Sequence, residues 1–306
     1  MKQTIVKLAN KISVIGAASC YGAKDMRCAD APIVFQKLAD APLFKHSGNI
    51  TWLKNIYPDH IPTSYSDKIS VISEVCKQLA KHTQNAIINQ ESFVVIGGDH
   101  SCAIGTWSGA YAALQKQGDI GLIWIDAHMD SHTMATSPTG AIHGMPLACL
   151  LGFGDEQLTG IEAPANKLKP SNVCLIGIRS YEKEEKAFLE KLGVKIFYIE
   201  DVEKLGINSV LTQAKILVSQ NTVAYGISID LDAIDPNDAP GVGSPEKNGL
   251  NAKELIDALK KLDFDDEFIG LEIAELNSEQ DLDDKTAKLA IKLINTIFQV
   301  RKHEYY

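Results

Sequence analysis

The segment LIWIDAHMDSHT, residues 122–133, contains a group of residues whose types and spacing could do chemistry. Asp126, His128 and Asp130 follow an apolar run and alternate along the chain. In an extended segment, residues two apart point to the same side, so these three side chains can meet in one pocket. Carboxylates and imidazoles that converge in this way are typical of metal ligands.

Two other segments add ligands of the same kinds. Asp230 and Asp232 repeat the alternating spacing in GISIDLDAIDP, and His100 follows another apolar run in GGDHS. Four ionised carboxylates cannot lie close together at neutral pH without compensating positive charge. No Lys or Arg lies inside the three motifs, so we expect two divalent cations roughly 3.5–4 Å apart. This oxygen-rich set favours Mn²⁺, with Fe²⁺, Co²⁺ or Zn²⁺ as possible substitutes.

Each motif alone also has a more ordinary interpretation. An Asp at a strand end usually caps the next helix, a role open to Asp99, and DLD before a proline-containing loop is usually a turn signal. The occurrence of the motifs at three separate strand ends favours the metal interpretation.

Short apolar runs rich in Val and Ile predict strands that are covered on both faces, as in a parallel sheet. The predicted strands are 12–18, 93–98, 120–126, 173–178, 195–199, 223–230 and 268–276. Amphipathic segments predict helices at about 66–84, 101–117, 182–192, 208–219, 251–262 and 283–300. The alternation indicates an α/β fold, a single three-layer α/β/α domain with a mostly parallel central sheet. No linker or repeat divides the chain, so we expect one catalytic domain over 1–306, with its site at the carboxyl ends of the strands.

Composition excludes some classes of partner and location. The 306 residues carry a net charge of −9 without a basic stripe, which argues against nucleic acid and anionic membranes as partners. No apolar run is long enough to span a bilayer. Lys2, Lys7 and Lys11 precede an apolar stretch at 14–20 that faintly resembles a lipoprotein signal, but it is too short and reads better as the first strand.

The cysteines form no CxxC pair, and most of them lie in apolar runs. They are Cys20, Cys28, Cys76, Cys102, Cys149 and Cys174. In a chain of this length the pattern predicts buried free thiols in a reducing compartment, and therefore a cytoplasmic protein.

GGDHS, DAHMD and SIDLDAIDP, in this order and spacing, resemble the arginase family of ureohydrolases, and the resemblance covers nearly the whole chain. It implies a binuclear manganese hydrolase that releases urea from a guanidino compound, in a homotrimer or homohexamer. Carried over by motif, one metal is expected on His100, Asp126, Asp130 and Asp230. The other is expected on Asp126, His128, Asp230 and Asp232.

A guanidinium is a poor electrophile, so its hydrolysis needs a strong nucleophile and a good acid. Two metals lower the pKa of a water between them, which supplies hydroxide at neutral pH, and Asp130 is placed to accept its hydrogen bond and move a proton. The leaving amine needs a general acid, for which the resemblance indicates His143 in TSPTGAIHGMPLA. It also indicates Glu275, in EIAELN, as the carboxylate that orients the guanidinium. Without the resemblance, His143 would more often be an exposed loop residue, and Glu275 could equally be a solvated acid at a strand end.

The resemblance also assigns the pocket that selects the substrate. The predicted substrate-binding residues are His128, His132, Ser137, Thr139, Glu182, Ser244 and Glu275. Ser137 and Thr139 offer hydroxyls to an α-carboxylate, and Glu182, where arginases usually have Asp, offers a partner to an α-ammonium. Ser244 corresponds to a family Thr near the guanidinium.

Two positions depart from the arginase pattern. Ala141 and His132 stand where arginases usually carry Asn, and losing one amide donor costs about 1–3 kcal/mol if its partner stays unpaired. A protonated His132 could instead pair a carboxylate. L-Arginine is the leading substrate, with ornithine and urea as products; agmatine or another guanidino compound without the amino-acid head is the alternative. A one-metal, deacetylase-like amide hydrolase and a non-catalytic metal-binding homologue are more remote alternatives.

Overall fold

The computed structural model describes residues 9–39, 50–163 and 166–300. Its strands form one sheet, in the order β2-β1-β3-β8-β7-β4-β5-β6, and all their pairings are parallel. The strands are β1 (Ala9–Ala17), β2 (Ile50–Ile56), β3 (Glu91–Gly97), β4 (Ile120–Ile125), β5 (Val173–Ile178), β6 (Lys195–Tyr198), β7 (Ala224–Asp230) and β8 (Phe268–Ala274). The predicted α/β class with a parallel central sheet is confirmed.

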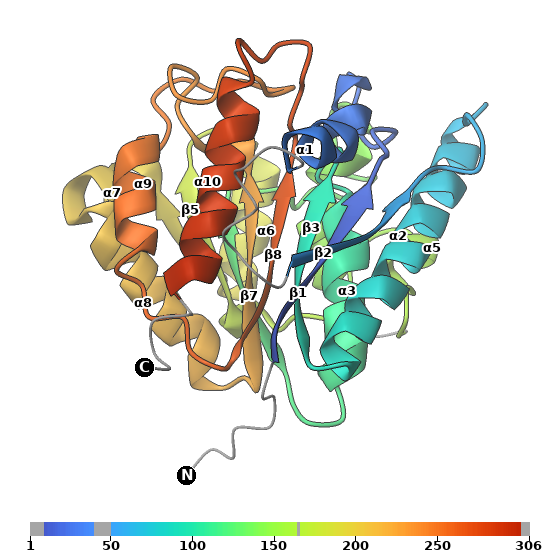
Figure 1. Cartoon of the computed structure of the whole chain (residues 1–306). Coiled ribbons are helices and arrows are strands. Elements are labelled where there is room, and N and C mark those ends of the chain that lie inside the picture. The colour runs from blue at the N-terminus through green and yellow to red at the C-terminus, as the bar shows by residue number, and fades with distance from the viewer. Residues whose placement is uncertain (1–8, 40–49, 164–165, 301–306) are drawn as a thin grey trace.

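Helices cover both faces of this sheet, which gives the three layers seen in Figure 1. They are α1 (Ala31–Ala39), α2 (Tyr65–Ile88), α3 (Cys102–Leu114), α4 (Pro146–Leu150), α5 (Glu156–Thr159), α6 (Lys183–Leu192), α7 (Ile199–Leu205), α8 (Ile207–Gln220), α9 (Ala252–Leu259) and α10 (Lys285–Val300). Buried side chains of α1, α7, α8, α9 and α10 pack on one face. Those of α2, α3, α4 and α6 pack on the other.

Strand β3 shows how the apolar runs build two cores at once. Val94 and Ile96 pack among the residues of the first face, whereas Phe93 and Val95 pack among those of the second. Successive side chains of a strand point to opposite faces, so a strand with helices on both sides must be apolar throughout. This is why its sequence shows a continuous run.

The sequence did not predict β2, α1, α4, α5 or α7. Strand β2 lies at the edge of the sheet, and most of its residues are partly or fully exposed. An exposed edge strand needs no continuous apolar run, so the pattern that revealed the inner strands is missing there. Three of the missed helices, α4, α5 and α7, have no more than seven residues, which is too short for a clear helical periodicity.

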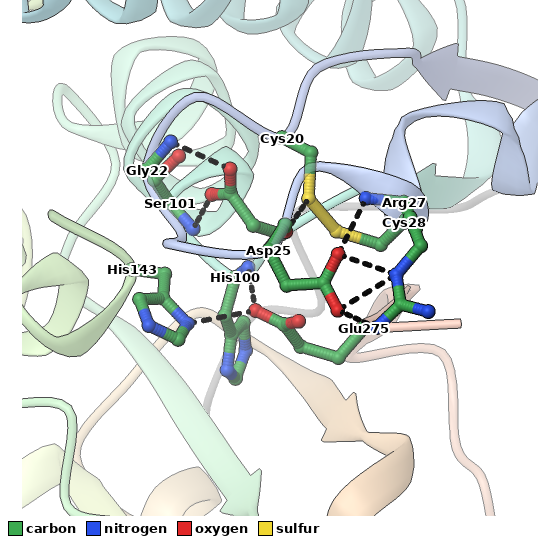
Figure 2. The surroundings of a disulfide bond; sticks show 10 residues. Cys20, Gly22, Asp25, Arg27, Cys28, His100, Ser101, His143 and Glu275 are labelled. Atoms are coloured by element: carbon green, nitrogen blue, oxygen red, sulfur yellow. Dashed lines mark hydrogen bonds and ion pairs between the residues drawn. A yellow bond between two sulfur atoms is a disulfide. The ribbon is translucent and has the colours of Figure 1, made fainter. Parts of the chain in front are cut away.

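The structure corrects the prediction for the cysteines. Cys76, Cys102, Cys149 and Cys174 are free and buried, as expected, but a disulfide joins Cys20 to Cys28 (Figure 2). The chain turns back after β1, so the Cα atoms of these two residues lie 5.8 Å apart. Nothing in their sequence spacing indicates this return.

The apolar stretch at 14–20 begins inside β1, as the sequence predicted; Lys2 and Lys7 lie outside the described residues. Within the ranges that the structure describes, no helix has both the length and the apolar character needed to cross a bilayer.

Candidate active site

The four central strands of the sheet carry the predicted chemistry at their carboxyl ends. His100 follows β3, Asp126 follows β4, Asp230 is the last residue of β7, and Glu275 follows β8. Because β3, β8, β7 and β4 are successive neighbours in the sheet, residues up to 175 positions apart in the chain lie at one edge. All of them are buried.

His100 is the centre of the first ligand cluster. Its Nδ1 lies 3.2 Å from Asp126 Oδ2, 3.0 Å from Asp130 Oδ2 and 3.2 Å from Asp230 Oδ2. The imidazole is fully buried, yet among the described residues this nitrogen has no hydrogen-bond partner. One ring nitrogen and three carboxylate oxygens therefore converge, as a divalent cation requires.

A chain of hydrogen bonds explains why Nδ1 can act as a ligand. His100 Nε2 lies 2.9 Å from the Ser228 hydroxyl, which donates to Glu272 Oε1 at 2.8 Å. A hydroxyl that donates to a carboxylate can accept the Nε2 proton of the ring, an arrangement in which Nδ1 is free to bind a cation. Trp124 stacks on the imidazole with ring centroids 4.2 Å apart and donates to Asp126 Oδ2 at 2.8 Å.

The sequence did not predict Ser228 and Glu272, the two residues that continue these hydrogen bonds from His100. Glu272 was the available signal, because a carboxylate in the middle of a fully buried strand needs a partner. Ser228 precedes Asp230 by two positions on β7, so both project toward the same face.

His128 is the centre of the second cluster. Its Nδ1 lies 3.1 Å from Asp232 Oδ2 and 3.6 Å from Asp126 Oδ1. Asp126 thus reaches both clusters with different oxygens. Asp230 was expected to serve both metals as well, but here it belongs to the first cluster alone, and its Oδ1 accepts the Asp232 N–H at 2.9 Å.

The electrostatics of the two clusters call for positive charge. Burial raises the pKa of Asp230 well above its ordinary value, and the neighbouring Asp232 and Asp126 raise it further. Burial and the Asp126 charge likewise raise the pKa of Asp130 to about 6. These carboxylates are therefore poorly tolerated as bare anions, and the residues present fit a pair of cations.

His143 and Glu275 form a pair beside the first cluster. His143 Nδ1 lies 3.0 Å from Glu275 Oε1, and the same oxygen accepts the His100 N–H at 2.9 Å. Burial is the largest single influence and lowers the pKa of His143, but the hydrogen bond with Glu275 and the negative charges of Glu275, Asp99 and Asp130 together outweigh it and raise that pKa to about 9. Glu275 has a positive φ of 68°, an uncommon conformation that aims its side chain at this point.

A third group of ionisable side chains, which the sequence predicted only in part, lines the same cavity. His132 Nε2 lies 2.9 Å from Glu182 Oε2 and 3.3 Å from Glu185 Oε2. Glu185 was missed by the sequence analysis, although it lies one helical turn after Glu182. It is buried, it accepts the Ser131 N–H at 3.0 Å, and burial raises its pKa to about 8.

A cavity of about 190 Å³ joins these groups. Its lining comprises His128, Asp130, His132, Ser137, Pro138, Thr139, Ala141, His143, Gly144, Glu182, Glu185, Asp230, Asp232 and Ser244. The two hydroxyls of the loop accept backbone N–H groups, from Gly140 to Ser137 at 2.9 Å and from Ala141 to Thr139 at 3.1 Å. Each hydroxyl can therefore still donate its proton to an anion in the cavity. His100, Asp126 and Glu275 are buried and do not belong to this lining.

Comparison with known proteins agrees with this geometry. The profile of the Arginase family matches residues 12–299. The chain is 38% identical to the arginase of Bacillus caldovelox over 75% of this chain and 76% of that protein. It is 32% identical to the arginase of Staphylococcus aureus strain MSSA476 over 94% of this chain and 96% of that one.

Solved structures give the same result. The crystal structure of the arginase from Bacillus subtilis superposes with a TM-score of 0.86 at 32% identity, covering 94% of this chain and 98% of that one. The Entamoeba histolytica arginase, solved with L-ornithine, superposes with a TM-score of 0.87 at 26% identity, covering 96% and 99% of the two chains. The family match, the identities and the converging ligand clusters together show that this chain belongs to the arginase family and is a hydrolase.

Proposed function

We propose that this hydrolase cleaves the guanidino group of L-arginine to give L-ornithine and urea. The observation that carries the proposal is the convergence of His100 Nδ1 with three carboxylates beside the His143–Glu275 pair. A metal-ligating edge and a candidate general acid thus border one cavity, whose other end offers charged and hydroxyl groups.

The metals of the proposed centre are two Mn²⁺ ions, with Co²⁺, Fe²⁺ or Zn²⁺ as substitutes. His100, Asp126, Asp130 and Asp230 would hold one, and Asp126, His128 and Asp232 the other. When bound, such ions lower the pKa of a water enough to supply a nucleophile at neutral pH. Oxygen-rich ligands without Cys favour Mn²⁺ over softer ions.

The residues around the metals divide the remaining work. Asp130 accepts a hydrogen bond from the attacking water and takes up its proton. Glu275 and Ser244 orient the planar guanidinium. His143 protonates the leaving amine, a role for which its raised pKa suits it, because the ring stays protonated at neutral pH.

The far end of the cavity would hold the amino-acid head. Glu182, beside the buried Glu185, provides negative charge for the α-ammonium, while Ser137, Thr139 and His132 provide donors for the α-carboxylate. The solved complex of the Entamoeba histolytica arginase with L-ornithine supports the assignment, since that ligand carries both groups.

The same region also supports the alternative substrate. His132 Nε2 already pairs with Glu182, so the α-ammonium of a substrate must compete with this imidazole for the Glu182 carboxylate. Ala141 has no side-chain amide that could bind the amino-acid head instead. A guanidino compound without the α-amino group, such as agmatine or 4-guanidinobutyrate, would avoid this competition.

One assay separates the candidates. Urea release from L-arginine, agmatine and 4-guanidinobutyrate is measured side by side on the manganese-loaded protein. A higher kcat/KM for L-arginine supports the proposal, and a preference for either other compound identifies the alternative. Binding without turnover at full metal occupancy would indicate a non-catalytic homologue, and one metal per chain would indicate the deacetylase-like class.

We also propose that residues 1–306 act as one catalytic domain in a cytoplasmic homotrimer or homohexamer. The four buried free cysteines support the reducing compartment. Light scattering coupled to size-exclusion chromatography measures the assembly, and a monomer would contradict this part of the proposal.

A further inference from the structure

The disulfide between Cys20 and Cys28 closes a short loop next to the candidate general acid. We call residues 20–28 the disulfide loop. Both sulfurs belong to residues that are only 2% exposed, whereas Lys24 and Met26 between them are exposed. The bond therefore lies directly beneath a surface turn. Figure 2 shows it in the same region of the molecule as Gly22, His143 and Glu275.

Gly22 connects the disulfide loop to His143. Its carbonyl accepts the Ile142 N–H at 2.8 Å and the His143 N–H at 3.2 Å. Its own N–H donates to Asp99 Oδ2 at 2.8 Å. One glycine thus joins the carboxyl end of β3 to the backbone of the residue that would protonate the leaving group. We call these hydrogen bonds the Gly22 contact.

The Gly22 contact depends on a very close approach. A Cβ on Gly22 would lie 2.5 Å from Asp99 Oδ1 and 2.9 Å from Ser101 Oγ, too close for any side chain. Asp99 is itself fixed, because it is buried and its Oδ1 accepts the Ser101 N–H at 2.9 Å. A shift of the loop away from this position would lengthen and weaken its hydrogen bonds to Asp99 and to the His143 segment.

The disulfide is the covalent constraint on this loop. The start of the loop is fixed to β3, since the Asp99 N–H donates to the Ser19 carbonyl at 3.1 Å. Across the turn, Arg27 pairs with Asp25 on the surface, with Nε to Oδ1 at 2.8 Å. Exposed ion pairs of this kind contribute little to stability, so between residues 20 and 28 the sulfur–sulfur bond is the main constraint on the turn. Beyond Cys28 the chain is held by the hydrogen bond from Ser278 to Asp30 and by the core packing of α1.

We infer that the Cys20–Cys28 bond is a redox-controlled positioning device for His143. With the disulfide formed, the Gly22 contact holds the His143 segment; with two thiols, the loop relaxes and turnover slows. The inference rests on the proposed function to the extent that His143 is the general acid. It accords with a reducing compartment, where protein disulfides are mostly transient or redox-sensing.

The switching reaction is thiol–disulfide exchange with a low-molecular-weight disulfide such as oxidised glutathione. One cysteine thiolate attacks that disulfide and expels one glutathione thiol; the second cysteine then attacks the mixed disulfide and expels the other. The two cysteines lose two electrons and two protons in total, and oxidised glutathione gains them as two thiols. Excess reduced glutathione reverses both steps.

The test uses the full-length, manganese-loaded protein in glutathione buffers of graded ratio. Differential alkylation and mass spectrometry give the oxidised fraction of Cys20 and Cys28, and urea release gives kcat and KM. Full reduction should lower kcat about tenfold, a fraction of what a general acid contributes, while KM and manganese content stay constant. In parallel, amide hydrogen exchange in the peptide containing Ile142 and His143 should accelerate.

Variants separate positioning from general loosening. Cys20→Ser combined with Cys28→Ser should show the low kcat in every buffer. Cys174→Ala, which removes a buried free thiol of β5, should keep the full redox response. Gly22→Ala should lower kcat with the disulfide intact and KM unchanged.

Several results would overturn the inference. They are equal kcat for the dithiol and disulfide forms, persistent thiols at Cys20 and Cys28 in the most oxidising buffer, or a fall in kcat that follows loss of manganese. If no buffer yields urea from any guanidino substrate, the proposed function fails instead. Amide exchange at Ile142 and His143 then still decides whether the disulfide holds their segment.

Discussion

The Nδ1 of His143 and the Oε1 of Glu275 lie 3.0 Å apart, and that same carboxylate oxygen accepts the N–H of His100. The candidate acid is therefore tied, through one oxygen, to the backbone of a candidate metal ligand. Any change in the position of Glu275 should therefore affect both His143 and the geometry of the first ligand cluster.

The first prediction concerns the acid itself. His143→Asn keeps a polar side chain of similar reach but removes the titratable proton. We expect kcat for urea release to fall by about 10²–10⁴, the usual contribution of a general acid, with the two metals retained. Metal analysis of the variant provides the control, and a kcat within about threefold of the parent chain would contradict the role of His143.

The second prediction concerns pH. A general acid is competent while protonated, so kcat should be lost as pH rises through about 9, the raised pKa of His143. The same raised pKa makes the free energy of unfolding depend on pH. The His143–Glu275 pair stabilises the folded protein fully below the ordinary His pKa of about 6.5, and this stabilisation is lost as pH rises through about 9, the pKa of His143 in the folded protein. Glu275→Gln should move the alkaline limb of kcat toward about 6.5. If the alkaline limb of kcat does not move in this variant, the limb reports the titration of a group other than His143.

The third prediction concerns the support of His100. Ser228→Ala removes the hydroxyl between His100 Nε2 and Glu272. Loss of such a ring-orienting partner typically lowers metal affinity about 10–100-fold, which titration of the apoprotein with Mn²⁺ measures. Ser73→Ala, a buried serine of α2 whose hydroxyl donates to the Gln157 carbonyl, is the matched control and should bind Mn²⁺ normally. Equal affinities would show that the chain of hydrogen bonds is not needed.

The fourth prediction concerns the substrate. His132→Asn combined with Ala141→Asn introduces the two amides that the arginase pattern usually has. If those amides hold the amino-acid head, kcat/KM for L-arginine should rise about tenfold or more, while that for agmatine stays level. A fall for L-arginine would show that His132 itself binds the head group.

The fifth prediction concerns metal removal. Dialysis against a chelator should abolish urea release and lower the melting temperature, because ions that bind only the folded chain stabilise it, by about 2.7 kcal/mol at 100 times their dissociation constant. Asp126→Ala should reduce the metal content below two per chain, since both clusters use this carboxylate. Asp257→Ala, on the surface of α9, should behave like the parent chain.

Local rules already determine a large part of this protein in the sequence. Covered strands need continuous apolar runs, and alternation by two places Asp126, His128 and Asp130 on one side of an extended segment. These rules require no knowledge of distant contacts. They therefore identify the class of fold, the ligands and the edge of the sheet where those ligands meet.

Only the tertiary structure decided which distant residues become partners. The strand order places β8 and β7 between β3 and β4, and this brings Glu272 and Ser228 to His100 and Glu275 to His143. Glu185 joins His132, and Cys20 meets Cys28, for the same reason. Such partners are chosen by the path of the chain between elements, and neither residue type nor local spacing encodes that path.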